Sequence, residues 1–589
     1  MSERRDQLLL RAAGTVLTLL AFLLPLKFGG LAVMPEAGGF YPTEWSSWLV
    51  VTFPPHALGL CSGAALALTL AAARPPTARS AKFILLWCVL PTLAALPGLR
   101  HGWSDESWGE VSNLLGIGAF GAAAALQSAA DARWGKRFAG AFLLGGMFCA
   151  VYGVYQFFYG LDELRAFTAE QIASGVDVPE SLRRKLADPR IFSTMASCNA
   201  LTSLMLMLIP IAWLRAGEWG RKFTPESVSR WVFRGVFFGL ILLNLIFAAS
   251  RGALFCLVGA GMLAVFSLPG PRPGLRLTAL ALALAILGGG LLFAVRYGRG
   301  LGSMTERADY LRTAAILTAE HPVSGGGWGE FFRRHMTIKR SDIGESARDP
   351  HNVVAAFASQ AGVLSGIAML AVLIVPLAAL WKRRFAPGFP AAVFWSGALF
   401  TLHSLLDCDW HVPALPAAMG MLYAAAWAET DDAAAPLRRR YDVALKLLLT
   451  ALAIAAAGCN LHYLRGDMAL ARLNDRLHPA SAEQAAAVAG WDVATLFRRA
   501  EALRPRSAAI RQMKGDWLWR NADLPGAEKC YFQALALDPR RPGTWARLAQ
   551  LAAMRGAPDE AYRRMRRAQE IFPKNPRYDA DKFMAEVKR

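Results

Sequence analysis

Long apolar runs, separated by short polar segments, fill most of the first 461 residues of the chain. A helix needs about 20 apolar residues to cross the hydrocarbon core of a bilayer. Thirteen runs approach that length: residues 11–33, 54–73, 82–99, 109–129, 138–160, 191–214, 231–249, 252–268, 277–297, 351–380, 388–408, 412–428 and 443–461. The pattern predicts an all-α fold, a polytopic transmembrane helix bundle of about 13 spans. No convincing cleavage site follows the first run, so we expect it to remain as a helix.

Residues 298–350 form the longest polar interruption of this pattern. Ser303–Glu306 reads Ser-Met-Thr-Glu, a capping box that predicts a helix running to about Glu320. His321-Pro322 should end this helix, and glycines within 325–329 predict a flexible turn before a short basic helix. Roughly fifty residues without structure would be unusual in a compact protein. We therefore expect a structured loop.

After Cys459 the chain becomes a charged, Ala-rich tail that repeats with a period of 34 residues. Ala527, Tyr531, Ala534 and Pro539 recur as Ala561, Met565, Ala568 and Pro573, and Phe497, Ala500 and Pro505 lie one period earlier. A period of this length is typical of tetratricopeptide (TPR) repeats, which stack as helix pairs. Such repeats serve as a concave docking surface for a partner or as a packing cap over the membrane domain, and the sequence leaves both interpretations open.

The basic charge of the chain is unevenly distributed. The formal net charge is +20, with 54% hydrophobic residues and a mean hydropathy of +0.30. Basic residues gather in alternate loops, which is the positive-inside pattern and favours orientation over nucleic-acid binding as their role. This pattern places the N-terminus inside, and residues 161–190, 298–350 and everything after 461 outside the cytoplasm. The eight Cys show no CxxC or metal-ligand spacing, so no disulfide framework is expected.

Two arginines lie at ends of apolar runs that are predicted to face outward. Arg190 precedes one run, and Arg251 occupies a tight Ser250-Arg251-Gly252 turn between two others. An ionisable group at such a place is a candidate functional residue, because its desolvation is costly unless it is paired. The forked guanidinium suits a phosphate or pyrophosphate ligand. The structural alternatives are an ion pair with a loop carboxylate and extension toward lipid headgroups.

The loop ends in Asp349-Pro350-His351-Asn352, which puts an imidazole and an amide at the predicted membrane surface. Imidazole has a pKa of about 6.5 and accepts a proton from a hydroxyl group at neutral pH. A lone His at a helix start is more often a polar interface residue, so composition alone leaves its role open. The glycines of 325–329 are followed by no Lys-Ser/Thr, which argues against a phosphate loop.

A second outward cluster runs from His403 to His411 and contains Asp407-Cys408-Asp409. An Asp-x-Asp pattern with flanking His is suited to a divalent cation. It is equally suited to pairing with the loop arginines, which would keep them oriented. We favour pairing over a metal ion.

Several strings of the chain resemble a known family. They are Met304-Thr-Glu-Arg-Ala-Asp-Tyr310, His321-Pro-Val-Ser-Gly-Gly-Gly-Trp-Gly-Glu-Phe331, His351-Asn352 with Gln360-Ala-Gly362 and Gly366, Arg190-Ile-Phe-Ser-Thr194 with Asn199, and Ser250-Arg251-Gly252. Over about residues 185–425 the chain resembles the O-antigen ligase/polymerase family, bacterial multi-span membrane glycosyltransferases with one large periplasmic loop. The TPR-like tail resembles an extension that some members carry. The family often has an acid where Gln360 stands.

The resemblance implies a glycan donor on undecaprenyl pyrophosphate, and no metal ion or other cofactor. Arg190 and Arg251 would bind the pyrophosphate, with Arg307 and Arg312 as further candidates. His351 would act as general base. The supporting residues would be Asn352, Asn199 and Asp407.

The expected organisation has four parts. Residues 1–184 hold N-terminal membrane helices, 185–430 the ligase-like core with the loop 298–350, 431–461 the last membrane helix, and 462–589 the TPR-like domain. The resemblance implies the bacterial inner membrane, with the loop and the tail in the periplasm.

The acceptor stays open between lipid A core, a second glycan and a protein, which correspond to a ligase, a polymerase and a protein O-oligosaccharyltransferase. Other partners would be membrane lipid and a protein bound by the repeats, but no nucleic acid. Two other classes are an anion transporter and a non-catalytic scaffold. Transporters commonly have internal repeats and helices broken near the middle of the membrane, and neither is evident.

Overall fold

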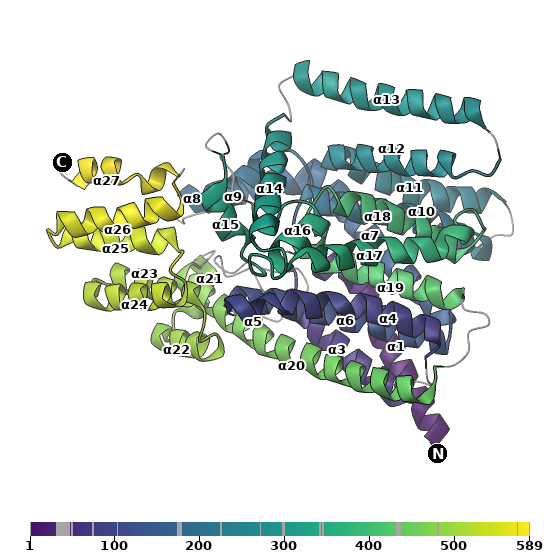
Figure 1. Ribbon diagram of the computed structural model, residues 1–589, viewed down its shortest axis with the longest axis horizontal. Helices are drawn as coiled ribbons and strands as arrows, with labels where there is room; N and C mark the ends of the chain where they lie inside the picture. Colours follow the sequence, from purple (N-terminus) through teal and green to yellow (C-terminus); the bar gives the residue numbers. More distant parts are fainter. Residues whose placement is uncertain are drawn as a thin grey trace.

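The computed structural model describes residues 2–30, 48, 51–72, 76–102, 104–173, 180–223, 227–270, 272–296, 301–340, 343, 347–430, 437–479, 482–573 and 575–587. Over these ranges every regular element is a helix, which confirms the all-α prediction (Figure 1). The apolar helices run side by side in one bundle, and the loop helices and the tail lie toward one end of it (Figure 1).

The apolar helices form a multi-pass membrane bundle. Within the described ranges, nine segments are long and apolar enough to cross a membrane. Each predicted apolar run overlaps a helix, and the total number of spans stays a prediction. The bundle helices are α1 (Ser2–Lys27), α3 (Pro55–Ala72), α4 (Ala78–Ala95), α6 (Asp105–Ala130), α7 (Arg133–Tyr155), α10 (Cys198–Phe223), α11 (Ser227–Ala248), α12 (Arg251–Phe266), α13 (Pro273–Arg296), α17 (Val363–Leu380), α18 (Phe389–Ser404), α19 (Ala414–Glu429) and α20 (Arg439–Leu477).

Helices α6 and α19 form the centre of the bundle, and most of their residues are buried. Both are rich in Ala and Gly, which let neighbouring helix backbones approach closely. A Cβ atom on Gly116 of α6 would lie 2.4 Å from the Cα atom of Gly59 in α3. Small residues thus permit the close packing of these helices.

Two predicted apolar runs differ from the helices of the structure. Residues 351–380 form two helices, α16 (Val353–Ala361) and α17, so the single predicted helix is wrong. Gly362 joins them with φ +91°, and a Cβ atom there would lie 2.2 Å from the carbonyl oxygen of Val323. Only glycine accepts both the conformation and the contact. The run predicted from residue 191 becomes helical only at Cys198, the start of α10.

The described residues of the polar interruption 298–350 fold onto the bundle. It contains α14 (Leu301–Glu320) and the short α15 (Phe331–Ile338). The helix end at Glu320 is confirmed, whereas Ser303 lies inside α14 and is not its N-cap. The glycine turn predicted to be flexible is tied to α16, because the N–H groups of Gly326 and Gly327 donate to the carbonyls of Ser359 (2.8 Å) and Gln360 (3.2 Å).

Short helices complete the membrane part. They are α5 (Pro97–His101), the π-helix η1 (Gln156–Gly160), α8 (Leu161–Ala173), α9 (Glu180–Ala187), η2 (Trp381–Arg383) and η3 (Asp409–His411). Helix η1 continues α7 into α8 without a break in the chain direction.

The tail is a row of paired helices that begins where α20 ends. Helix α20 is continuous past Cys459, so the change in composition there does not interrupt it. The pair α23 and α24 recurs 34 residues later as α25 and α26, and Ala527 and Ala561 are buried at equivalent places. Assignment to the TPR class stays a prediction. The tail helices are α21 (Ala482–Val488), α22 (Val493–Leu503), α23 (Ala508–Arg520), α24 (Leu524–Leu537), α25 (Pro542–Met554), α26 (Pro558–Ile571), η4 (Pro576–Tyr578) and α27 (Ala580–Val587).

Candidate functional site

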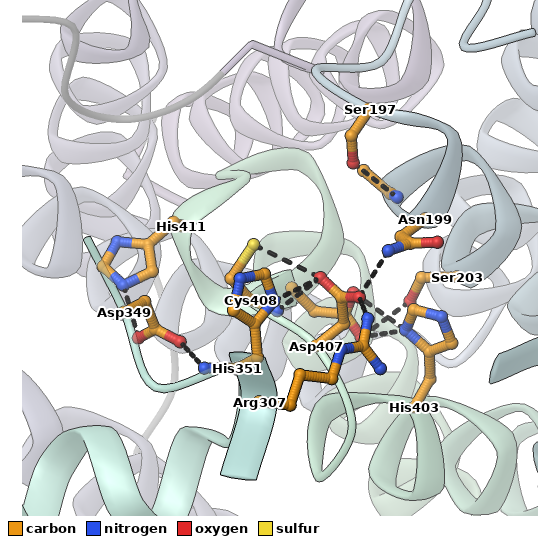
Figure 2. A network of polar contacts seen from close by, with 12 residues as sticks. Ser197, Asn199, Ser203, Arg307, Asp349, His351, His403, Asp407, Cys408 and His411 are labelled. Carbon is orange, nitrogen blue, oxygen red and sulfur yellow. Dashed lines mark hydrogen bonds and ion pairs between the residues drawn. The ribbon is translucent and has the colours of Figure 1, made fainter. Parts of the chain in front are cut away.

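Asp407 is the point on which the polar residues of the site converge. It lies between α18 and η3 and is buried, with 4% of its surface exposed. Its Oδ2 accepts hydrogen bonds from Arg307 of α14 (2.8 Å) and Asn199 of α10 (2.6 Å), and its Oδ1 contacts Nδ1 of His351 at 3.2 Å (Figure 2). Three segments far apart in the sequence therefore meet at one carboxylate. A buried carboxylate of this kind is stable only when it is paired and hydrogen-bonded.

His351 is held in an unusual backbone conformation, with φ +56°. The Asp349 carboxylate accepts the N–H of His351 at 2.7 Å, an Asx-type turn that stabilises this conformation. Asn352 then caps α16 by accepting the N–H of Ala355 at 3.0 Å. The ring of His351 stacks on Tyr310 of α14 with centroids 5.5 Å apart. The imidazole is thus fixed from its backbone, its ring face and its Nδ1.

This arrangement leaves Nε2 of His351 as the basic nitrogen. A carboxylate that accepts from Nδ1–H selects the tautomer in which Nε2 carries the lone pair. The side chain of His351 is 26% exposed. Burial by itself would lower the pKa of His351, but the hydrogen bond and negative charge of Asp407 outweigh it and raise that pKa. Burial would raise the pKa of Asp407, yet contact with His351 and Arg307 holds it well below its ordinary value.

A second pair, Asp349 and His411, lies beside His351 (Figure 2). Nε2 of His411 contacts the Asp349 carboxylate at 2.9 Å. Burial opposes the charge on His411, but Asp349 outweighs it and raises the pKa of His411 to about 9. His411 is therefore cationic at neutral pH and balances the charge of Asp349.

Asp409, the other acid of the Asp-x-Asp pattern, has a structural environment. It accepts from His403 (2.9 Å), Ser203 (2.9 Å) and Ser404 (3.2 Å), and all of these residues are buried. These contacts hold the turn after α18 against α10. Asp409 therefore positions Asp407.

A metal ion is the alternative occupant for part of this cluster, because ligand atoms of His351, Asp407 and Cys408 lie within 4.8 Å of one another. The donor set suits an ion poorly. Asp407 already pairs with Arg307 and Asn199. Burial, and then the charge of Asp407, raise the pKa of Cys408 well above its ordinary value, so it stays a thiol. A thiol is a weak ligand compared with a thiolate. The geometry fits the arginine pairing expected from the sequence.

The four predicted arginines divide into two groups. Arg307 lies at Asp407, and Arg251 begins α12 next to Ser250, whose hydroxyl contacts Asn199 at 3.2 Å. Arg190 pairs with Asp188 at 2.5 Å, and this hydrogen bond raises the pKa of Arg190. The charge of Asp407 also acts on Arg190, so Arg190 and Arg307 both lie near this carboxylate, and the backbone of Arg251 follows Ser250 beside Asn199.

Arg312 points elsewhere. Its guanidinium contacts Asp309 and the carbonyl of Ile338, both at 3.1 Å, and so joins α14 to the end of α15. The structure does not bring it to Asp407 with Arg307.

Sequence reasoning missed two residues that shape the site. Gln156 begins the π-helix η1, and its side-chain oxygen accepts the N–H groups of Phe192 (2.8 Å) and Ser193 (2.7 Å), which fixes the segment after Arg190. The signal was an amide inside an apolar run, which is costly unless it has partners. Tyr310 stood in the family-like string but was given no role.

Residues 236–371 match the family described as O-antigen ligase. The match contains Arg251, Arg307, Arg312, His351 and Asn352. This segment belongs to the O-antigen ligase family. The chain is therefore an O-antigen ligase- or polymerase-like membrane glycosyltransferase. The match does not reach Arg190, Asn199 or Asp407, which the fold brings to the same place. A comparison with curated proteins finds no significant match.

Proposed function

We propose that this O-antigen ligase-like protein transfers a glycan from an undecaprenyl-pyrophosphate carrier to an acceptor hydroxyl at the periplasmic face of the bacterial inner membrane. His351 is the general base, and Arg190, Arg251 and Arg307 bind the pyrophosphate. The step requires no resident metal ion. Lipid-linked glycan and a glycan acceptor are the partners that this family implies.

The reaction is a direct displacement at the anomeric carbon of the donor sugar. The acceptor oxygen forms a bond to this carbon as the bond to the pyrophosphate oxygen breaks, and the configuration inverts. The hydroxyl proton passes to Nε2 of His351. The leaving undecaprenyl pyrophosphate takes the electron pair of the broken bond.

Fixed cations supply the larger share of catalysis, because negative charge grows on the pyrophosphate as it leaves. Asp188 and Asp407 hold Arg190 and Arg307 in place before the donor binds. A guanidinium has five N–H donors, so pairing with a carboxylate does not exhaust its capacity to bind an anion. Arginines held in this way need little reorganisation when the donor arrives.

The observation that carries the proposal is the contact of His351 with Asp407 at 3.2 Å, with Arg307 on the same carboxylate at 2.8 Å. It supports the proposal because the same carboxylate contacts both the proposed base and a cation. Glycosyl transfer to a hydroxyl requires a base for the proton and a nearby cation for the leaving anion, and here both contact the same side chain.

The test is transfer by the purified full-length protein in detergent, supplied with lipid-linked glycan extracted from the native host. His351→Gln should lower the turnover by about 10²–10⁴-fold, because glutamine cannot accept the proton. The matched control is His462→Gln on α20, an exposed His outside the site. Wild-type turnover in His351→Gln would refute the role of His351 as base.

The acceptor is identified from the glycans of a deletion strain. Loss of capped lipid A with accumulation of long lipid-linked polymer indicates a ligase. Single repeat units left on lipid indicate a polymerase. Unchanged glycan with an altered pilin or secreted protein indicates protein glycosylation.

A further inference from the structure

In Figure 2, Asp349 and His411 lie on one side of His351, and Arg307 and Asn199 lie on the other. Two cavities lie near this cluster, an inner one whose lining includes Asp349 and His411 and an outer one beyond it. The inner cavity is narrow, about 30 Å³, and reaches both carboxylates that bind His351. The outer cavity holds about 210 Å³ and is lined in part by the tail. Glu110 of α6 lines both cavities, which are therefore neighbours.

Several side chains that line the inner cavity carry a buried polar atom without a hydrogen-bond partner among the described residues. The indole N–H groups of Trp328 and Trp410 have no hydrogen-bond partner within the described chain, although these side chains are only 6% and 8% exposed. A carboxylate oxygen of Glu110 is unpartnered as well. A buried indole N–H normally finds an acceptor, so two in one cavity are unusual. Two N–H donors and a carboxylate acceptor in side chains that line one cavity suit a ligand with hydroxyl groups, since a hydroxyl both donates and accepts hydrogen bonds.

The outer cavity has the side chains that bind a sugar. Aromatic rings cover its apolar surface, and arginine, glutamine and carboxylate groups offer directed hydrogen bonds, a mixture typical of sites for small polar ligands. A single water needs a cavity of roughly 10–15 Å³, so the volume of the outer cavity is many times larger than one water requires. Its aromatic and planar polar lining residues include Phe332, Phe572, Tyr578, Arg348, Arg541 and Gln512.

The tail forms one wall of the outer cavity and is fixed there by ion pairs. Arg333 of α15 contacts Asp538 of the tail at 2.8 Å and also pairs with Glu106 of α6. Arg540 of the tail contacts Glu330 at 2.7 Å. The side chains of Arg333 and Asp538 are each only 11% exposed. The wall is therefore built before any ligand arrives, which lowers the entropy lost on binding.

We propose that the outer cavity, between α15 and the turn from α24 to α25, binds the sugar residues of the acceptor. The acceptor hydroxyl then approaches His351 from the side of the inner cavity. This inference rests on the proposed function. Inverting displacement needs the nucleophile and the leaving group on opposite faces of the anomeric carbon. Arg307 on one side of His351 and an acceptor hydroxyl that arrives from the inner cavity on the other would allow this arrangement.

The binding test uses full-length protein in detergent and a fluorescently labelled oligosaccharide, released by mild acid from the surface glycan of the native host. Tyr578→Ala and Gln512→Ala each remove a lining group of the tail wall. We expect each to weaken oligosaccharide binding by about ten-fold or more, as loss of a central contact residue does. The control is Phe532→Ala on α24, an aromatic residue that is 46% exposed and does not line the cavity.

The kinetic test separates the two substrates. In the transfer assay, Tyr578→Ala and Gln512→Ala should raise KM for the acceptor and leave KM for the lipid-linked donor unchanged. Equal oligosaccharide binding by these variants and by wild type, or an unchanged acceptor KM, overturns the inference. Acceptance of a protein substrate with no oligosaccharide binding overturns it too.

Measuring oligosaccharide binding by His351→Ala distinguishes a failure of this inference from a failure of the proposed function. This variant retains both cavities and should bind the labelled oligosaccharide as wild type does. Retained transfer in His351→Ala would count against the proposed chemistry. Lost binding in Tyr578→Ala, measured without any transfer step, would still support the sugar site.

Discussion

Nδ1 of His351 and Oδ1 of Asp407 lie 3.2 Å apart, although 56 residues separate them in the chain. The carboxylate orients the ring, selects its tautomer and increases its basicity. Because Arg307 binds the other oxygen of Asp407, one side chain organises both the base and a cation of the proposed donor site.

Asp407→Asn should reduce turnover by about 10²–10⁴-fold, because an amide neither stabilises the imidazolium nor enforces the required tautomer. The measurement is turnover of purified protein at saturating donor and acceptor. Cys408→Ser is the neighbouring control, since the serine hydroxyl can still donate to Oδ1 of Asp407 as the thiol does at 3.4 Å. If Asp407→Asn and Cys408→Ser lose activity equally, the turn as a whole matters and the carboxylate has no special part.

The pH dependence of turnover should report the raised pKa of His351. A general base must be neutral, so turnover is low below this pKa, rises with pH through it and levels off above it. The midpoint is expected above the ordinary value of about 6.5. Asp407→Asn removes the group that raises the pKa while burial, which lowers it, remains. The midpoint in this variant should therefore move to lower pH. A pH-independent turnover would contradict the assignment.

Arg307→Lys tests the pyrophosphate site while keeping the positive charge. Lysine lacks the planar fork that holds Asp407 and an anion together, so KM for the donor should rise by about 10-fold or more. Arg312→Lys is the control on the same helix, because Arg312 contacts Asp309 and Ile338 instead. Its donor KM should stay near that of wild type. Equal effects of the two substitutions would mean that general positive charge on α14 attracts the donor.

The sequence predicted the helices well because the length of each apolar run is enough to indicate a membrane helix. It failed where a break is made of apolar residues: Ala361-Gly362-Val363 looks like continuous helix, and only the approach of Val323 shows why Gly362 turns there. The convergence at Asp407 followed partly from the expected pairing of the Asp-x-Asp acids with loop arginines. Which arginine pairs depends on the rotation of α14, which places Arg307 at Asp407 and Arg312 at Ile338.

The packing of the segment between α14 and α15 against α16 depends on the glycine turn before α15. Gly325 has φ +64°, and a Cβ atom there would lie 2.2 Å from the carbonyl carbon of Gln360. Gly325→Ala should destabilise the protein by about 2–4 kcal/mol, from left-handed strain and overpacking together. Gly261→Ala in α12 is the control, because a Cβ atom there meets nothing within 4 Å. Thermal unfolding in detergent should show a lower midpoint for Gly325→Ala alone.

The attachment of the tail depends on Arg333, whose pKa is raised because Glu106, Glu330 and Asp538 outweigh the effect of burial. Arg333→Gln leaves buried carboxylates without their cation, a change that typically costs about 3–5 kcal/mol. We expect the tail to detach from the loop, measured as faster proteolytic cleavage between the membrane bundle and the tail.

Arg567→Gln is the matched control, since Arg567 and its partner Glu570 are 55% and 54% exposed. An exposed pair contributes little, about 0–1 kcal/mol, so cleavage should not change. Adding Asp538→Asn to Arg333→Gln removes one unpaired charge and should restore part of the protection. Protection that is the same in Arg333→Gln and in wild type would show that apolar packing alone holds the tail.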